Sequence, residues 1–105
     1  MEKQEYALKA QEFAEDVALC VIGEYGHYPS RHIDFKLTYR FDSGGEISRF
    51  FPSVKIFYVQ RSLYLMAEEF FSKEAFPAAE SRGETPKKEN MDFRVYVPWE
   101  DYGRD

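Results

Sequence analysis

The sequence predicts an α+β domain, in which two helices pack on one face of an antiparallel sheet of about four strands. Two patterns lead to this fold class. Residues 32–42 alternate polar and apolar side chains and precede Ser43-Gly44-Gly45, as in the first strand and turn of a β-hairpin. Residues 3–24 and 62–75 carry apolar side chains at three- and four-residue steps, as amphipathic helices do. We expect the order α-β-β-β-α-β within a single domain, residues 1–105.

The first helix is predicted over residues 3–24. Its remaining face is rich in Glu and Asp, so we expect the apolar stripe to pack against the hairpin. Cys20 lies at the flank of the stripe with no adjacent base or cation, so we expect an inert, buried thiol. Pro29 prevents the helix from continuing. The stripe consists of Tyr6, Ala10, Phe13, Val17 and Val21.

The hairpin, with its second strand over residues 46–51, has two possible registers. A three-residue loop, Ser43–Gly45, places Phe41 opposite Ile47 and turns Arg49 towards the helices. A two-residue loop, Gly44-Gly45, turns Arg49 outward and sets it opposite another arginine, which costs stability. A shift of one residue exchanges the two faces of a strand, so only one register is populated. We prefer the three-residue loop.

Residues 54–59 allow two interpretations. Their β-branched and aromatic side chains favour a third strand, which we adopt, followed by a helix over residues 62–75. The alternative is one long helix over residues 53–74 with a single apolar seam. Periodicity alone does not decide between them for so short an apolar run. The seam would consist of Ile56, Val59, Leu63, Met66 and Phe70.

The C-terminal third is predicted to hold a loop and a last strand. Pro77 is expected to end the second helix. Residues 77–91 are polar and contain Pro and Gly, which predicts a flexible loop. Residues 92–99 alternate again, and Pro98 favours a position at the edge of the sheet. The inner face of this strand would carry Phe93, Val95, Val97 and Trp99.

Charge is unevenly distributed along a chain whose net charge is −5. Residues 31–61 hold six basic and three acidic residues, whereas both flanking segments are acidic. The overall acidity argues against broad binding to nucleic acids or anionic membranes. No apolar run is long enough to span a membrane. The single cysteine excludes an intrachain disulfide and favours a reducing, cytoplasmic setting.

No pattern in the sequence predicts catalysis or a cofactor. His32 and Asp34 share the polar face of the first strand, and His27 precedes it, but Lys36 follows on the same face. No second pair of ligands is present, so we expect no metal site. The chain also lacks the glycine-flanked nucleophile, the zinc-protease motif and the phosphate-binding glycine loop. We therefore expect a non-enzymatic protein without a cofactor.

The face of the sheet turned away from the helices carries the predicted binding residues. Lys36, Arg40, Arg94 and Tyr96 are expected there together. Arg49 is a further candidate, because an inward guanidinium requires a carboxylate or an anionic ligand. Arg and Tyr often anchor protein interfaces, and a basic face steers an acidic partner. We predict that the protein docks another protein, or a second copy through this face or an edge strand.

Two alternatives to protein docking stay open. The same side chains suit single-stranded nucleic acid, although the acidic remainder of the chain opposes it. A pocket between sheet and helices, lined by His27, His32 or Arg49, would instead indicate a small-ligand or enzyme domain. By order of elements alone, the plan resembles that of bacterial secretion chaperones and some toxin-immunity proteins. This resemblance implies an inhibitor, an immunity or antitoxin-like protein, or a chaperone-like subunit.

Overall fold

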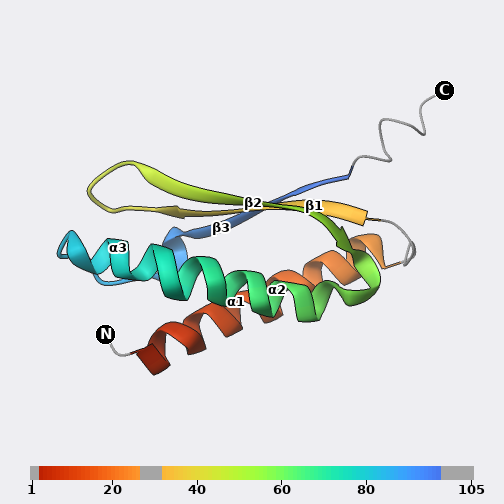
Figure 1. Ribbon diagram of the computed structural model, residues 1–105, viewed down its shortest axis with the longest axis horizontal. Coiled ribbons are helices and arrows are strands. Elements are labelled where there is room, and N and C mark those ends of the chain that lie inside the picture. The colour runs from red at the N-terminus through yellow and green to blue at the C-terminus, as the bar shows by residue number, and fades with distance from the viewer. Residues whose placement is uncertain (1–2, 27–31, 98–105) are drawn as a thin grey trace.

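The computed structural model of the chain describes residues 3–26 and 32–97, and it confirms the α+β class. Two layers are visible in Figure 1, with a three-stranded antiparallel sheet above and the helices below it. The elements in chain order are α1 (Lys3–Tyr25), β1 (His32–Arg40), β2 (Glu46–Lys55), η1 (Ile56–Tyr58), α2 (Val59–Ala67), η2 (Glu68–Ala75), α3 (Phe76–Ser81), η3 (Lys88–Asn90) and β3 (Met91–Tyr96).

Strand β1 lies in the centre of the sheet, whose order is β2-β1-β3. Its alternate side chains all point to the helices and are fully buried, as the alternation predicts. Both helical segments reach this inner face. The Phe13 ring of α1 lies 6.2 Å from that of Phe93 in β3, and the Phe76 ring of α3 lies 5.9 Å from that of Tyr39. The buried side chains of β1 are Ile33, Phe35, Leu37 and Tyr39.

The hairpin has a longer loop than either predicted register. The Phe41 N–H donates to the Gly45 carbonyl at 3.0 Å, and the Gly44 N–H donates to the Phe41 carbonyl at 3.1 Å. Arg40 therefore pairs with Glu46, and both predicted registers are wrong. The preferred one differs from the structure by two residues. Such a shift preserves the faces of a strand, so the predicted inward direction of Arg49 is confirmed.

A β-bulge at Ser53 lets β2 continue past the point where we expected it to break. The register shifts by one residue between the pairs Ile33–Val54 and Phe35–Phe51. Ser53 has a φ of 58°, and its N–H donates to Oδ1 of Asp34 at 2.8 Å. Because of the extra residue, Phe51 and Val54 both turn to the inner face.

The predicted strand over residues 54–59 is wrong. Val54 and Lys55 end β2, and the chain is helical from Ile56 to Ser81, as in the long-helix alternative. This conformation buries Ile56 and Val59 against the helix seam and leaves Phe57 and Tyr58 exposed. The predicted number of strands is consequently one too high among the described residues.

An eight-residue π-helix, η2, keeps the long helix in phase with the core. Along α2 the buried side chains recur at steps of three or four residues, but the pair Phe70-Phe71 is followed by the buried pair Ala75-Phe76, five residues later. The Phe76 N–H accordingly bonds to the carbonyl of Phe71, which is the i→i+5 pattern of a π-helix. Pro77 lies in the first turn of α3, so the prediction that it ends the helix is wrong.

The last third of the chain contains more regular structure than predicted. Residues 77–81 are helical and residues 88–90 form a turn of 3₁₀-helix, so the connection is shorter than the expected loop. The flexibility predicted for residues 77–91 stays a prediction. Strand β3 confirms the last strand at the sheet edge, with Phe93, Val95 and Val97 packed against the core. Trp99, predicted on the same face, lies outside the described residues.

Glu84 joins the connection after α3 to the hairpin loop. Its carboxylate accepts bonds from the N–H of Asp42 at 2.6 Å and from the Ser43 hydroxyl at 2.6 Å. The Arg82 guanidinium stacks on Phe41, 3.8 Å from the ring centroid, and donates to the Gly44 carbonyl at 3.1 Å. These contacts hold the far end of the hairpin against the end of the long helix.

Deletion of Lys73 tests the origin of the π-helix. Removing one residue shortens the five-residue step to four, so the segment can form an ordinary α-helix with its apolar side chains still in phase. The Lys73–Glu69 ion pair that is lost is exposed and contributes little. We expect a cooperative unfolding transition in urea and a loss of less than ~1 kcal/mol.

Deletion of Gln60 in α2 is the matched control. It rotates Ile56 and Val59 by about 100° out of the seam. Withdrawing a large aliphatic side chain from a core costs about 2–5 kcal/mol. The control variant should therefore lose most of its stability, and equal losses in the two deletions would contradict the role given to the π-helix.

Stability should depend on pH through Glu84. The hydrogen bond from Ser43 is the largest cause that lowers the pKa of Glu84, and bonds from Asn90 and Lys87 likewise lower the pKa of Asp42. A carboxyl whose pKa is lowered in the folded state stabilises the fold at pH values above its ordinary pKa. This stabilisation is lost as the pH falls through the lowered pKa. We expect Glu84→Gln to be less stable than the parent at pH 7.

The difference between the parent and Glu84→Gln should shrink as the pH falls below the ordinary pKa of glutamate, 4.5. The midpoints of urea unfolding of both proteins, measured from neutral to acid pH, give this difference in stability. Glu24→Gln, which changes an exposed carboxyl of α1, should run parallel to the parent. A Glu84→Gln difference that is constant with pH would show that the charge of Glu84 does not contribute.

Candidate docking surface

The described helices leave one face of the sheet uncovered, and we call it the outer sheet face (Figure 1). Strand registers place its residues in rows across the three strands, because directly paired residues point to the same side. Lys36 is flanked by Phe50 of β2 and Arg94 of β3, and Thr38 by Ser48 and Asp92. The other members are Asp34, Arg40, Glu46 and Tyr96.

Two aromatic rings and two cations gather at the centre of this face. The ring centroids of Phe50 and Tyr96 lie 6.0 Å apart, although their strands are separated by β1. The Arg94 guanidinium lies 5.1 Å from the centroid of the Tyr96 ring. Phe50 is 53% exposed, a large value for a phenylalanine in a strand. We call Lys36, Phe50, Arg94 and Tyr96 the basic–aromatic cluster.

The charges of Lys36 and Arg94 have no acidic partner among the described side chains, in contrast to the charge of Arg40. Arg40 lies 3.0 Å from a carboxylate oxygen of Asp92 and 3.8 Å from one of Glu46. Asp34 accepts a hydrogen bond from the backbone at Ser53. Positive charge is thus left over at the cluster, whereas it is balanced at the neighbouring row.

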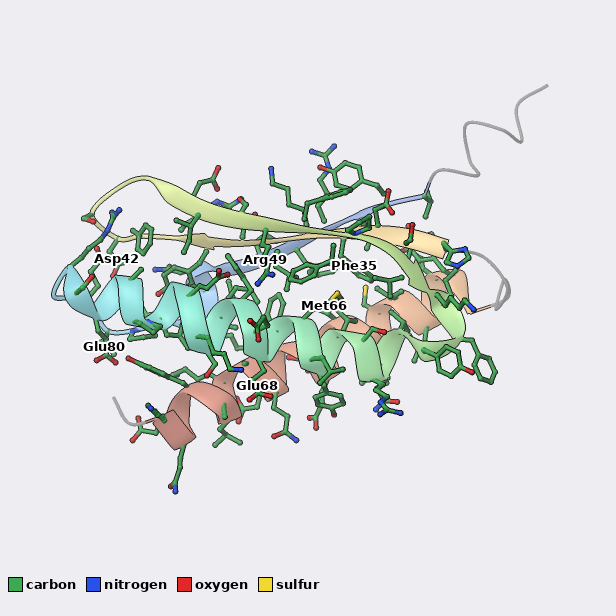
Figure 2. All side chains as sticks on the ribbon, viewed as in Figure 1. Phe35, Asp42, Arg49, Met66, Glu68 and Glu80 are labelled. Carbon is green, nitrogen blue, oxygen red and sulfur yellow. The ribbon has the colours of Figure 1, made fainter. Side chains whose placement is uncertain are left out.

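Arg49 lies on the opposite side of the sheet from the cluster. In Figure 2 its side chain points from β2 towards the long helix. Its guanidinium is 3.6 Å from Glu74 and 4.0 Å from Glu69, and it stacks at 5.3 Å on the ring of Phe51. The inward guanidinium of Arg49 is therefore paired with carboxylates of the same chain, and Arg49 does not belong to the outer sheet face.

The structure brings three of the five predicted binding residues together, namely Lys36, Arg94 and Tyr96. Arg40 shares their face but lies about 13 Å further along β1 and is paired. Phe50 was missed by sequence reasoning, although its outward direction follows from the inward direction of Arg49. That inference requires the correct hairpin faces, which the preferred register supplied.

Other chemical sites find no support in the described part of the chain. No group of three or more His, Cys, Asp or Glu residues within it is placed to hold a metal ion. His32 begins β1, and His27 lies outside the described residues. Cys20 is exposed on α1, so the expectation that it is buried is wrong. No described helix is long and apolar enough to cross a membrane.

A hollow at the flank of the described structure is an open groove and not an enclosed pocket. It lies beside β2 and α2, has a volume of about 600 Å³, and is lined mainly by apolar side chains. Neither His32 nor Arg49 lines it. The small-ligand alternative, which expects a pocket lined by His27, His32 or Arg49, stays a prediction.

Comparisons with known proteins yield no match. No family model fits the chain, and no curated protein or solved structure was found to be similar to it.

The role of Arg49 can be tested with a double-mutant cycle of Arg49→Met and Glu74→Gln. Both side chains are nearly half exposed, so water screens the pair and we expect a coupling energy below ~1 kcal/mol. Urea unfolding of the parent, the two single variants and the double variant gives this energy. A coupling of several kcal/mol would instead identify a desolvated pair on which the fold depends.

Proposed function

We propose that the protein is a non-enzymatic interaction domain that docks an acidic segment of another protein on its outer sheet face. The basic–aromatic cluster is the observation that carries this proposal. Exposed aromatic side chains and arginine are enriched where proteins bind one another, and lysine and arginine without internal partners attract carboxylates. A carboxylate of the partner would lie between Lys36 and Arg94, and its apolar neighbour on the Phe50 and Tyr96 rings.

The local charge balance favours a protein partner over nucleic acid. Arg40 is neutralised by Asp92 and Glu46, which are themselves part of the same face. The phosphate backbone of a nucleic acid bound along the sheet would contact Lys36 and Arg94, but it would also lie beside these acidic side chains. Binding of nucleic acid depends on many phosphates being neutralised at once, and two cations supply little of this. A single carboxylate requires only the two.

Single-stranded nucleic acid is the second candidate, and the two adjacent rings of Phe50 and Tyr96 favour it. Bases stack on such rings in sheet-based binding domains. The two candidates use the same four side chains but differ in their dependence on salt and on the partner. An inhibitor, immunity-like or chaperone-like role is compatible with the first candidate and requires no cofactor.

Capture from a lysate of the source organism tests the proposal. The immobilised parent is compared with Lys36→Glu/Arg94→Glu, and bound proteins are quantified by mass spectrometry. We expect the reversed charges to reduce recovery of the acidic partner at least about tenfold, because each lost charge contact weakens binding by more than 1 kcal/mol. The partner is then titrated in purified form.

Lys3→Glu/Lys9→Glu on α1 is the matched control, since it changes the net charge equally on another element. It should retain the partner. Fluorescence anisotropy with a single-stranded RNA of mixed sequence, at low salt, should show no saturable binding. Equal capture by the cluster and control variants would refute docking on this face, and RNA binding lost in the cluster variant would establish the second candidate.

A further inference from the structure

An open groove runs along the flank of the molecule, between the free edge of β2 and the outer side of α2. Its larger part, of about 600 Å³, includes Val54 and Tyr58, and its smaller part, of about 310 Å³, includes Glu68 and Glu69. The two parts are continuous, because they share the lining residues Phe51, Leu65 and Met66. We call the whole the β2–α2 groove.

Large apolar side chains are left open to water in this groove. Leu65 is 62% exposed and Tyr58 is 55% exposed, at the middle and the end of the groove. Exposed apolar surface that lines a concavity indicates an interaction site more strongly than scattered exposed residues do. In Figure 2, Met66 points from the helix towards the sheet and forms the floor between the two layers.

The two ends of the groove carry opposite charges. Lys55 and Arg61 lie at the end where β2 turns into the helix. Glu68 and Glu69 lie at the other end, where Lys73 pairs with Glu69 at 3.3 Å and leaves the charge of Glu68 unpaired. Arg61, Leu65 and Glu68 follow one another at steps of four and three residues, so they form one stripe on the outer side of the helix. Neither Arg61 nor Glu68 has an ion-pair partner among the described residues.

These two charges do not satisfy each other within one chain. Seven residues of helix separate them by about 10 Å along the axis. A twofold rotation through Leu65, however, exchanges the two ends of the stripe. Arg61 of one copy then faces Glu68 of the other, twice, on either side of a contact between the two Leu65 side chains. Such self-complementarity is the requirement for a symmetric dimer interface.

We propose that a second copy of this chain occupies the β2–α2 groove, antiparallel to the first, so that the protein is a symmetric homodimer. This interface is distinct from the outer sheet face. An acidic peptide would satisfy Lys55 and Arg61 but would be repelled by the unpaired Glu68, whereas a second copy matches both ends. The dimer extends the prediction of self-association to a defined surface and a defined orientation.

Side chains, not strand pairing, carry this interface. Pro52 lacks an N–H and the bulge at Ser53 turns the strand, and both features interrupt a free edge that would otherwise be able to pair with another strand. The unpaired edge of β2 is thereby reduced to its first half. The groove beside its second half is where the apolar and charged groups gather.

Sedimentation velocity and light scattering on the full chain test the proposal across micromolar to near-millimolar concentrations. We expect the parent to be a dimer. Arg61→Glu brings like charges together at both ends of the interface, and so does Glu68→Arg. Each single variant should therefore self-associate at least tenfold more weakly than the parent.

Mixing the two single variants provides the decisive measurement. In a mixed dimer both ends again pair opposite charges, the native Arg61–Glu68 pair at one end and the exchanged pair at the other. The combined variant Arg61→Glu/Glu68→Arg carries the exchanged pair at both ends. We expect a heterodimer in the mixture, detected by energy transfer between labelled copies, and a homodimer of the combined variant. Recovery of association in the mixture shows that both single variants are folded.

Lys36→Glu serves as the control on the outer sheet face and should leave the dimer unchanged. A parent that is monomeric at every concentration would overturn the proposal. So would a dimer that both single variants leave intact, because it would use another surface. Partner capture by Lys36→Glu/Arg94→Glu is a separate measurement from dimerisation. Failure of one proposal therefore does not imply failure of the other.

Discussion

Burial of one face of β1 is the constraint on which the rest of the structure depends. This strand is paired on both edges, and its inner side chains are fully buried beneath the helices that precede and follow the hairpin. Because a strand points alternate side chains to opposite faces, the same alternation that supplies the core also leaves a polar outer face. The core and the candidate docking surface are therefore two consequences of one pattern between His32 and Arg40.

Features that repeat over many residues could be predicted from the sequence, and features that depend on a single residue could not. The stripe of α1 and the alternation of β1 extend over several turns or pairs, so their elements were identified correctly. The hairpin register depends on where five loop residues close, and the bulge depends on Ser53 adopting a positive φ. The local pattern of residues 54–59 is compatible with a strand and with a helix. The helix is favoured only by the apolar seam that these residues share with Leu63 and Met66.

Sequence reasoning about the candidate site reached its limit in the same way, at the level of single contacts. Lys36, Arg94 and Tyr96 follow from alternation along two strands. Whether a cation on that face is free depends on the β1–β3 register, which places Asp92 beside Arg40. That pairing joins segments more than fifty residues apart, and local periodicity contains no information about it. The same limit hid the exposure of Cys20, which depends on where α2 lies against α1.

The two proposed surfaces have a geometric relation that gives the dimer a functional consequence. Two layered subunits that lie side by side with antiparallel helices are related by an axis perpendicular to the layers. Both outer sheet faces then point to the same side of the dimer, and neither is covered by the contact between the grooves. A partner with two acidic segments, or two partners in one assembly, would meet both clusters at once. The second contact becomes intramolecular, so two weak sites of a few charges and rings each can hold a partner far more tightly than one.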